Sequence, residues 1–82
     1  MAADYAAVKS MVERGVGRGY THCLIVVDEF DYEDYPVYIP ECQDVQDMIA
    51  TTNALSMQRV IEVYNYSKDL EEQLRRDRCW EI

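Results

Sequence analysis

One stretch of the sequence, residues 20–30 (YTHCLIVVDEF), is apolar at every position from Cys23 to Val27. Successive side chains of a strand point to opposite faces, so positions 23, 25 and 27 share one face and positions 24 and 26 share the other. A strand that is apolar on both faces is covered on both sides. The run is also far shorter than the roughly 20 residues that a membrane-spanning helix needs. We therefore predict a central strand in a covered sheet.

The remaining segments predict a single small α+β domain. Periodicity and turn residues indicate the following order: a helix at 3–14, a glycine-rich turn at 15–19, a β-hairpin at 20–39, a helix at 43–53, a strand at 57–66 and a helix at 68–79. Pro36 lacks an N–H donor, which assigns the second strand to a sheet edge. A right-handed crossover then gives a three-stranded sheet in the order 2-1-3, with helices packed on it.

Three finer assignments accompany this order. The segment 57–66 also fits a helical template, but its β-branched and aromatic residues favour a strand. Gly15 is the expected C′ residue of the first helix, and Ser67 is the expected N-cap of the last one. The last helix should also carry i,i+4 ion pairs between Glu and Arg, which are Glu71–Arg75 and Glu72–Arg76.

The negative charge is concentrated in one segment. The chain has 16 acidic and 8 basic residues, for a net charge of −8. Residues 19–58 contain no Lys or Arg and eight of the acids, while the other eight acids are balanced by the eight bases. Such a field repels nucleic acid and anionic membranes and attracts basic protein surfaces.

Tyrosines are interleaved with these acids, which suggests a protein-binding surface. Carboxylates at alternate strand positions recur every ~6.6 Å, close to the spacing of phosphates along one DNA strand, and tyrosine is enriched at interface hot spots. The candidate partner-binding residues are Asp28, Glu29, Asp31, Tyr32, Glu33, Asp34, Tyr35, Tyr38, Glu41, Asp44 and Asp47. The alternative is that the acids form a solvated face and the tyrosines pack against the inner side of the hairpin.

The sequence offers little support for catalysis or metal binding, and we expect neither an enzyme nor a cofactor. His22 and Cys23 are neighbours on a strand and point to opposite faces, so they make a poor catalytic pair. Segment 28–34 is rich in carboxylates but lacks the glycine of a calcium loop. Three cysteines without CxxC spacing indicate a reduced intracellular protein. Residues 1–10 lack the features of a signal peptide, so we expect a cytoplasmic location.

Two segments carry a resemblance to a known group of proteins. Residues 30–38 (FDYEDYPVY) and 57–74 (MQRVIEVYNYSKDLEEQL) resemble small acidic proteins that bacteriophages encode in their accessory regions, over Thr21 to Leu74. The resemblance implies a protein of the host-cell cytoplasm. It also implies the anti-defence class, which includes anti-CRISPR proteins, several of which resemble DNA in charge.

These observations together predict an acidic inhibitor that binds a basic surface of a host nucleic-acid-handling protein and occludes it, without binding nucleic acid or membrane itself. Two alternatives remain open. One is a small-ligand or divalent-metal-binding accessory protein that uses the hairpin tip. The other is a homo-oligomeric accessory protein, such as a homodimer, joined through the last helix or the edge strand.

Overall fold

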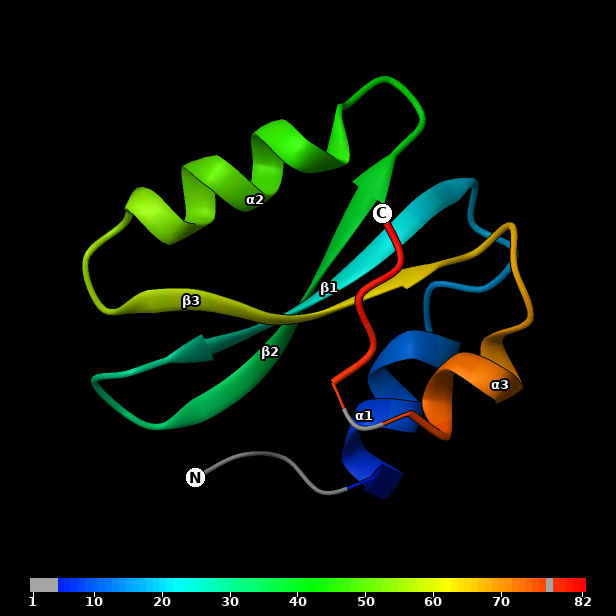
Figure 1. Cartoon of the computed structure of the whole chain (residues 1–82), viewed down its shortest axis with the longest axis horizontal. Coiled ribbons are helices and arrows are strands. Elements are labelled where there is room, and N and C mark those ends of the chain that lie inside the picture. Colours follow the sequence, from blue (N-terminus) through cyan, green and yellow to red (C-terminus); the bar gives the residue numbers. More distant parts are fainter. Residues whose placement is uncertain (1–4, 77) are drawn as a thin grey trace.

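The computed structural model of the chain describes residues 5–76 and 78–82. The predicted α+β class and the α-β-β-α-β-α order are confirmed (Figure 1). The elements are α1 (Tyr5–Glu13), β1 (Tyr20–Asp28), β2 (Glu33–Pro40), α2 (Val45–Ala54), β3 (Gln58–Asn65) and α3 (Leu70–Leu74). Segment 57–66, which also fits a helix, is indeed a strand over most of its length.

The sheet has the predicted order β2-β1-β3. β1 is antiparallel to both neighbours, so β2 and β3 are parallel to each other. Cys23 pairs with Tyr38 on β2 and with Tyr64 on β3, which fixes the register on both sides of the central strand. The edge position of β2 agrees with Pro36, whose ring nitrogen has no hydrogen to donate to a further strand.

Two hydrophobic cores lie on the two faces of β1. α1 and α3 cover the face that carries Cys23 and Ile25, and α2 covers the face that carries Leu24 and Val26 (Figure 1). All four side chains are fully buried. This arrangement confirms the predicted coverage of both faces of β1. The side chains of one face pack against α1 and α3, and those of the other face pack against α2.

Two tyrosine hydroxyls donate hydrogen bonds to backbone carbonyls near the C-terminal end of α1. Tyr38 Oη donates to Met11 O and Tyr66 Oη donates to Val12 O, both at 2.6 Å. These bonds help to satisfy the carbonyl groups of the last turn, where Val12 O also accepts a hydrogen bond from Gly15 N at 3.1 Å. A Cβ atom at Gly15 would lie 2.8 Å from the Tyr38 ring and closer still to the Tyr66 hydroxyl. Gly15 is therefore required for close approach. α1 ends at Glu13, so Gly15 occupies the predicted C′ position two residues later, although its φ is not positive as in a typical glycine C′.

The outer edge of β3 is closed by three different groups. The N–H of Val60 donates to Asn53 Oδ1 at 2.9 Å, and the N–H of Val63 donates to Cys79 O at 2.8 Å. The N–H of Asn65 donates to Gln73 Oε1 at 2.8 Å. The chain after α3 returns beside β3, where Trp80 forms a parallel bridge to Val63. These contacts occupy backbone groups that an open edge strand would offer to another chain.

The last helix is shorter than predicted. The sequence predicts a helix over 68–79 with Ser67 as N-cap, whereas α3 spans Leu70–Leu74 and its N-cap is Asp69, which accepts hydrogen bonds from the N–H groups of Glu71 and Glu72. Ser67 instead donates to Asn65 Oδ1 through its N–H and its hydroxyl. The helix stops early because Cys79 is buried in the core and its carbonyl binds the edge of β3. That tertiary packing outweighs the helical pattern of the sequence.

Candidate protein-binding site

The turn that joins β1 to β2 is built around Asp28. The carboxylate of Asp28 accepts a hydrogen bond from the N–H of Phe30 at 2.9 Å, and its carbonyl oxygen accepts one from Tyr32 at 2.6 Å. An aspartate that binds the N–H two residues on is a typical turn-forming device. Tyr32 takes the left-handed conformation with φ of 57°, which directs the chain into β2. The turn is thus fixed by local bonds.

The loop between α2 and β3 lies against this turn. The N–H of Glu29 donates to Met57 O at 2.7 Å, and the hydroxyl of Tyr35 donates to the side-chain oxygen of Gln58. In Figure 1 the hairpin turn and this loop lie at the same end of the sheet. We call residues 28–35 together with 55–58 the acidic end.

Large hydrophobic side chains are exposed at the acidic end. The exposed fractions are 74% for Phe30, 63% for Tyr32, 55% for Leu55, 46% for Met57 and 37% for Tyr35. Exposed apolar side chains are common singly, but a group of them at one end is typical of an interaction site. Of these five, the sequence prediction includes only the two tyrosines.

Phe30 could have been found from the sequence, whereas Leu55 and Met57 could not. Phe30 is a large apolar residue in a turn that otherwise consists of acids and a tyrosine, where polar residues are expected. Leu55 and Met57 reach the acidic end because β3 pairs with β1, with Gln58 opposite Asp28, and because the loop bonds to Glu29. No local pattern in the sequence indicates that contact.

Four carboxylates of the acidic end carry a charge that no described cation neutralises. Within residues 5–76 and 78–82, Asp28, Glu29, Asp31 and Glu33 form no ion pair. The ion pairs between described residues lie in the C-terminal part and include the two predicted ones, Glu71–Arg75 at 3.4 Å and Glu72–Arg76 at 2.8 Å. Acidic side chains without intramolecular cations keep their full attraction for an external basic group.

Asp34 lies apart from the exposed carboxylates. It is half-buried and pairs with Val27 in the register of the sheet, so it shares the face that α1 and α3 cover farther along β1. Burial raises the pKa of Glu62 on β3, and the negative charge of Asp34 adds to the rise. Asp34 therefore acts electrostatically on a neighbour within the protein.

The structure divides the predicted binding surface. Glu41, Asp44 and Asp47 follow the far end of β2, and a strand of eight residues separates them from the hairpin turn by about 26 Å. Asp44 serves as the N-cap of α2, where its carboxylate accepts hydrogen bonds from Gln46 N at 2.8 Å and Asp47 N at 3.4 Å. These three acids do not join the acidic end.

Tyr38 is also placed elsewhere. Its ring stacks on Tyr20 with the centroids 5.1 Å apart, and its hydroxyl is bonded to α1. For this tyrosine the structure agrees with the alternative that it packs on the inner side of the hairpin. Tyr32 and Tyr35 remain at the acidic end.

Two of the three cysteines, Cys23 and Cys79, are buried. No group of three or more His, Cys, Asp and Glu side chains in that part of the chain is arranged to hold a metal ion. Burial raises the pKa of Cys23 to about 12 and that of Cys79 to about 11, so both are protonated thiols at neutral pH. Cys42 is exposed.

The comparisons with known proteins add no relative. A scan against protein-family models and searches of curated proteins and of solved structures find no match. No helix in residues 5–76 and 78–82 is long and apolar enough to cross a membrane. Function is therefore inferred from the side chains at the acidic end.

Proposed function

We propose that this protein is an acidic binding protein that docks its acidic end onto a basic surface of a nucleic-acid-handling protein and thereby inhibits it. The observation that carries the proposal is the exposure of Phe30 and Tyr32 beside carboxylates that have no ion pair among the described residues. Exposed aromatic rings flanked by charge match the anchors and rim of a protein interface.

Each kind of side chain has a separate role in the proposed contact. Carboxylates such as Asp31 and Glu33 pair with Arg and Lys residues that would otherwise bind phosphates. Phe30 and Tyr32 supply the apolar area that excludes water around those pairs. Since the turn is already ordered by Asp28 and Met57, little conformational entropy is lost on docking.

The contact we propose is compact. Along one face of β2 the residues are Glu33, Tyr35, Val37 and Ile39, so that face carries a single carboxylate. The acids gather around a turn and do not form a row with phosphate-like spacing. Inhibition therefore rests on blocking a basic site by charge and shape, as in the anti-CRISPR-like class that the sequence resembles.

The proposal is tested by capture and competition. The tagged protein is used to capture partners from a bacterial lysate at about 50 and 300 mM salt, where screening differs strongly. We expect a partner that is lost at the higher salt, and we expect the captured partner to lose its binding of labelled nucleic acid when the protein is added. A partner that binds nucleic acid equally well in its presence contradicts the proposed occlusion, and release by a chelator favours the metal-binding alternative.

A further inference from the structure

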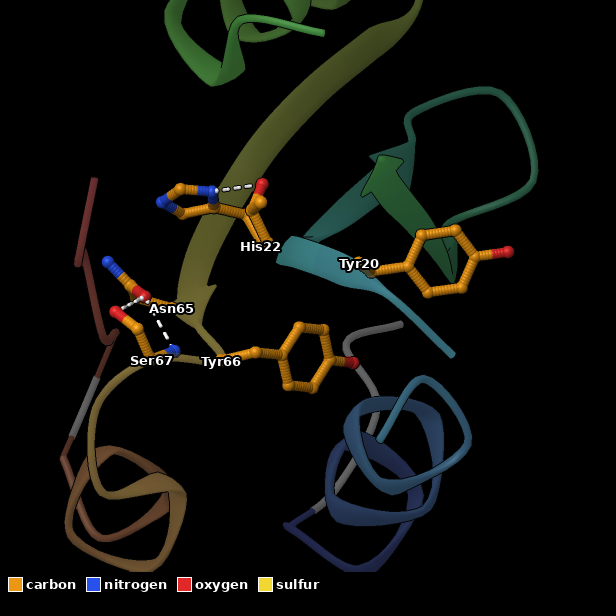
Figure 2. Close-up of a pocket in the computed structure, with 6 residues that line it drawn as sticks. Tyr20, His22, Asn65, Tyr66 and Ser67 are labelled. Carbon is orange, nitrogen blue, oxygen red and sulfur yellow. Dashed lines mark hydrogen bonds between the residues drawn. The ribbon is translucent and has the colours of Figure 1, made fainter. Parts of the chain in front are cut away.

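An open pocket lies at the opposite end of the sheet from the acidic end. Its volume is about 430 Å³, and its lining residues are Tyr20, Thr21, His22, Asn65, Tyr66 and Ser67 (Figure 2). The pocket forms where β1 begins and β3 ends, and the N–H of Tyr66 donates to Thr21 O at 2.9 Å across this end. We call it the end pocket. Its volume falls within the range of small-molecule sites.

The hydrogen bonds of Thr21 favour one tautomer of His22. The hydroxyl of Thr21 donates its only hydrogen to Ile39 O at 3.3 Å. We assign it as the acceptor toward His22 Nδ1, which lies 2.9 Å away, because this choice satisfies both contacts of the hydroxyl. Burial lowers the pKa of His22, so the ring is neutral at pH 7. The proton is thus on Nδ1, and Nε2 presents a lone pair.

His22 Nε2 is a buried acceptor without a hydrogen-bond partner in the described part of the chain. A buried polar atom that water cannot reach is costly to leave unpaired, and such atoms are rare in native proteins. A donor brought by a ligand would satisfy Nε2.

Asn65 presents a donor beside this acceptor. Its Oδ1 accepts hydrogen bonds from Ser67 N at 2.9 Å and Ser67 Oγ at 2.6 Å, which fixes the orientation of the amide. Nδ2 is then a donor without a hydrogen bond to any other described residue. Gln73 holds the backbone of Asn65 through bonds of 2.8 and 2.9 Å to its N–H and carbonyl. Asn65 is therefore rigidly positioned.

The two side chains face the same way. His22 and Asn65 are directly paired between β1 and β3, so both lie on one face of the sheet. Figure 2 shows the imidazole and the amide on one side of the pocket and the two tyrosine rings on the other. The protein thus offers an acceptor at Nε2 and a donor at Nδ2 from neighbouring strands.

We propose that the end pocket binds a small planar ligand that carries an N–H donor next to an acceptor, which is the hydrogen-bonding edge shared by nucleobases and primary carboxamides. The ligand N–H donates to His22 Nε2, and Asn65 Nδ2 donates to the ligand's carbonyl oxygen or ring nitrogen. This site is independent of the acidic end, because Asp28 lies six positions after His22 along β1, or about 20 Å away.

The test is an NMR titration of the ¹⁵N-labelled protein with two matched pairs of probes. Adenosine is compared with N6,N6-dimethyladenosine, and nicotinamide with N,N-dimethylnicotinamide, each up to about 5 mM. We expect saturable shifts of the Asn65 side-chain NH₂ and the His22 ring for one parent compound, with affinity at least about tenfold weaker for its dimethyl analogue. A response to adenosine alone assigns a nucleobase, and a response to nicotinamide alone assigns a carboxamide. Equal binding of parent and analogue, or no shift with any probe, overturns the proposal.

Matched variants separate the roles of the two nitrogens. His22→Gln places an amide oxygen near the position of Nε2 and should retain binding. His22→Asn keeps a donor near the position of Nδ1, loses the acceptor and should abolish the shifts. Asn65→Asp keeps the oxygen that binds Ser67 and removes the donor, so it should also abolish them. Unchanged spectra of the acidic end show that each variant is folded, and binding by His22→Asn equal to wild type would contradict the site.

Discussion

The backbone N–H of Glu29 donates a hydrogen bond to the carbonyl oxygen of Met57 at 2.7 Å. This bond fastens the acidic turn of the hairpin to the loop that precedes β3, so exposed side chains from two distant segments form one surface. The hydroxyl of Tyr35 makes a second attachment to Gln58. A surface that is ordered before a partner arrives loses less conformational entropy on binding.

The first prediction concerns Phe30. Its ring is 74% exposed, so Phe30→Ala should change the free energy of unfolding by no more than about 0.5 kcal/mol. If the ring is an interface anchor, the same change should weaken binding of the captured partner by about 1–2 kcal/mol. Calorimetric titration measures the binding loss, and thermal unfolding measures stability. Val16→Ala is the control, because Val16 is exposed outside the acidic end and its truncation should leave binding unchanged.

The second prediction concerns the packing of Gly15 against two tyrosines. Gly15→Ala places a methyl group against the Tyr66 hydroxyl and the Tyr38 ring, and should destabilise the fold by about 1–3 kcal/mol. Tyr66→Phe removes the bond to Val12 O and should cost about 1 kcal/mol by itself. Because it also removes the clashing oxygen, the double variant should be more stable than the sum of the two losses. Additive losses in urea unfolding would show that the hydroxyl does not limit the space at Gly15.

The third prediction concerns pH. Burial raises the pKa of Glu62 above its ordinary value of 4.5, although a hydrogen bond from Tyr64 opposes the rise. The folded state therefore binds a proton more tightly than the unfolded state, and the stability that this group contributes is lost as pH rises through the raised pKa. Glu62→Gln keeps an oxygen for Tyr64 and should raise the free energy of unfolding at about pH 7, with little effect near pH 4.

Unfolding curves at the two pH values measure this difference. Glu41→Gln serves as the control, because Glu41 is exposed and its replacement should alter stability little at either pH. A Glu62→Gln variant that is less stable than wild type at neutral pH would show that the ionised carboxylate is favourable where it lies.

The fourth prediction concerns nucleic acid. No Lys or Arg occurs in residues 19–58 and the net charge is −8, so we expect no binding of free DNA or RNA at about 150 mM salt. An electrophoretic mobility assay at micromolar protein measures this directly. A shifted band would contradict a mode of action in which the protein competes with nucleic acid for a basic surface.

The sequence predicts those parts of the fold in which local pattern and packing agree. The apolar run from Cys23 to Val27 is central because both of its faces are covered, and this coverage is visible in its composition. The predicted helix over 68–79 is too long, because the sequence pattern does not reveal that Cys79 is buried and that its carbonyl is bonded to the edge of β3. Long-range backbone bonds of this kind leave no periodic signal.

The candidate site shows the same limit. The charge and the tyrosines of the hairpin turn can be read from adjacent residues, whereas Leu55 and Met57 join them through the pairing of Gln58 with Asp28 and the bond to Glu29. In the other direction, Tyr38 is close to the acids in sequence but is bonded to Met11 on α1. Proximity in sequence therefore identifies the residues of the turn, but it does not identify which other residues lie beside the turn in the fold.

The fifth prediction tests the central claim most directly, by charge reversal at two places. The structure shows that Asp31 and Glu33 are exposed at the acidic end, and that Glu41 and Asp47 are exposed beyond the other end of β2. The double variants Asp31→Lys with Glu33→Lys and Glu41→Lys with Asp47→Lys change the net charge equally. The deciding measurement is the affinity of the captured partner for each variant, after thermal unfolding has shown that both are folded. We predict a loss of at least about 100-fold for the first, because like charges then face each other in the contact, and a loss of less than about tenfold for the second, which lies outside it. Equal losses in the two variants, or wild-type affinity in the first, would contradict binding through the acidic end.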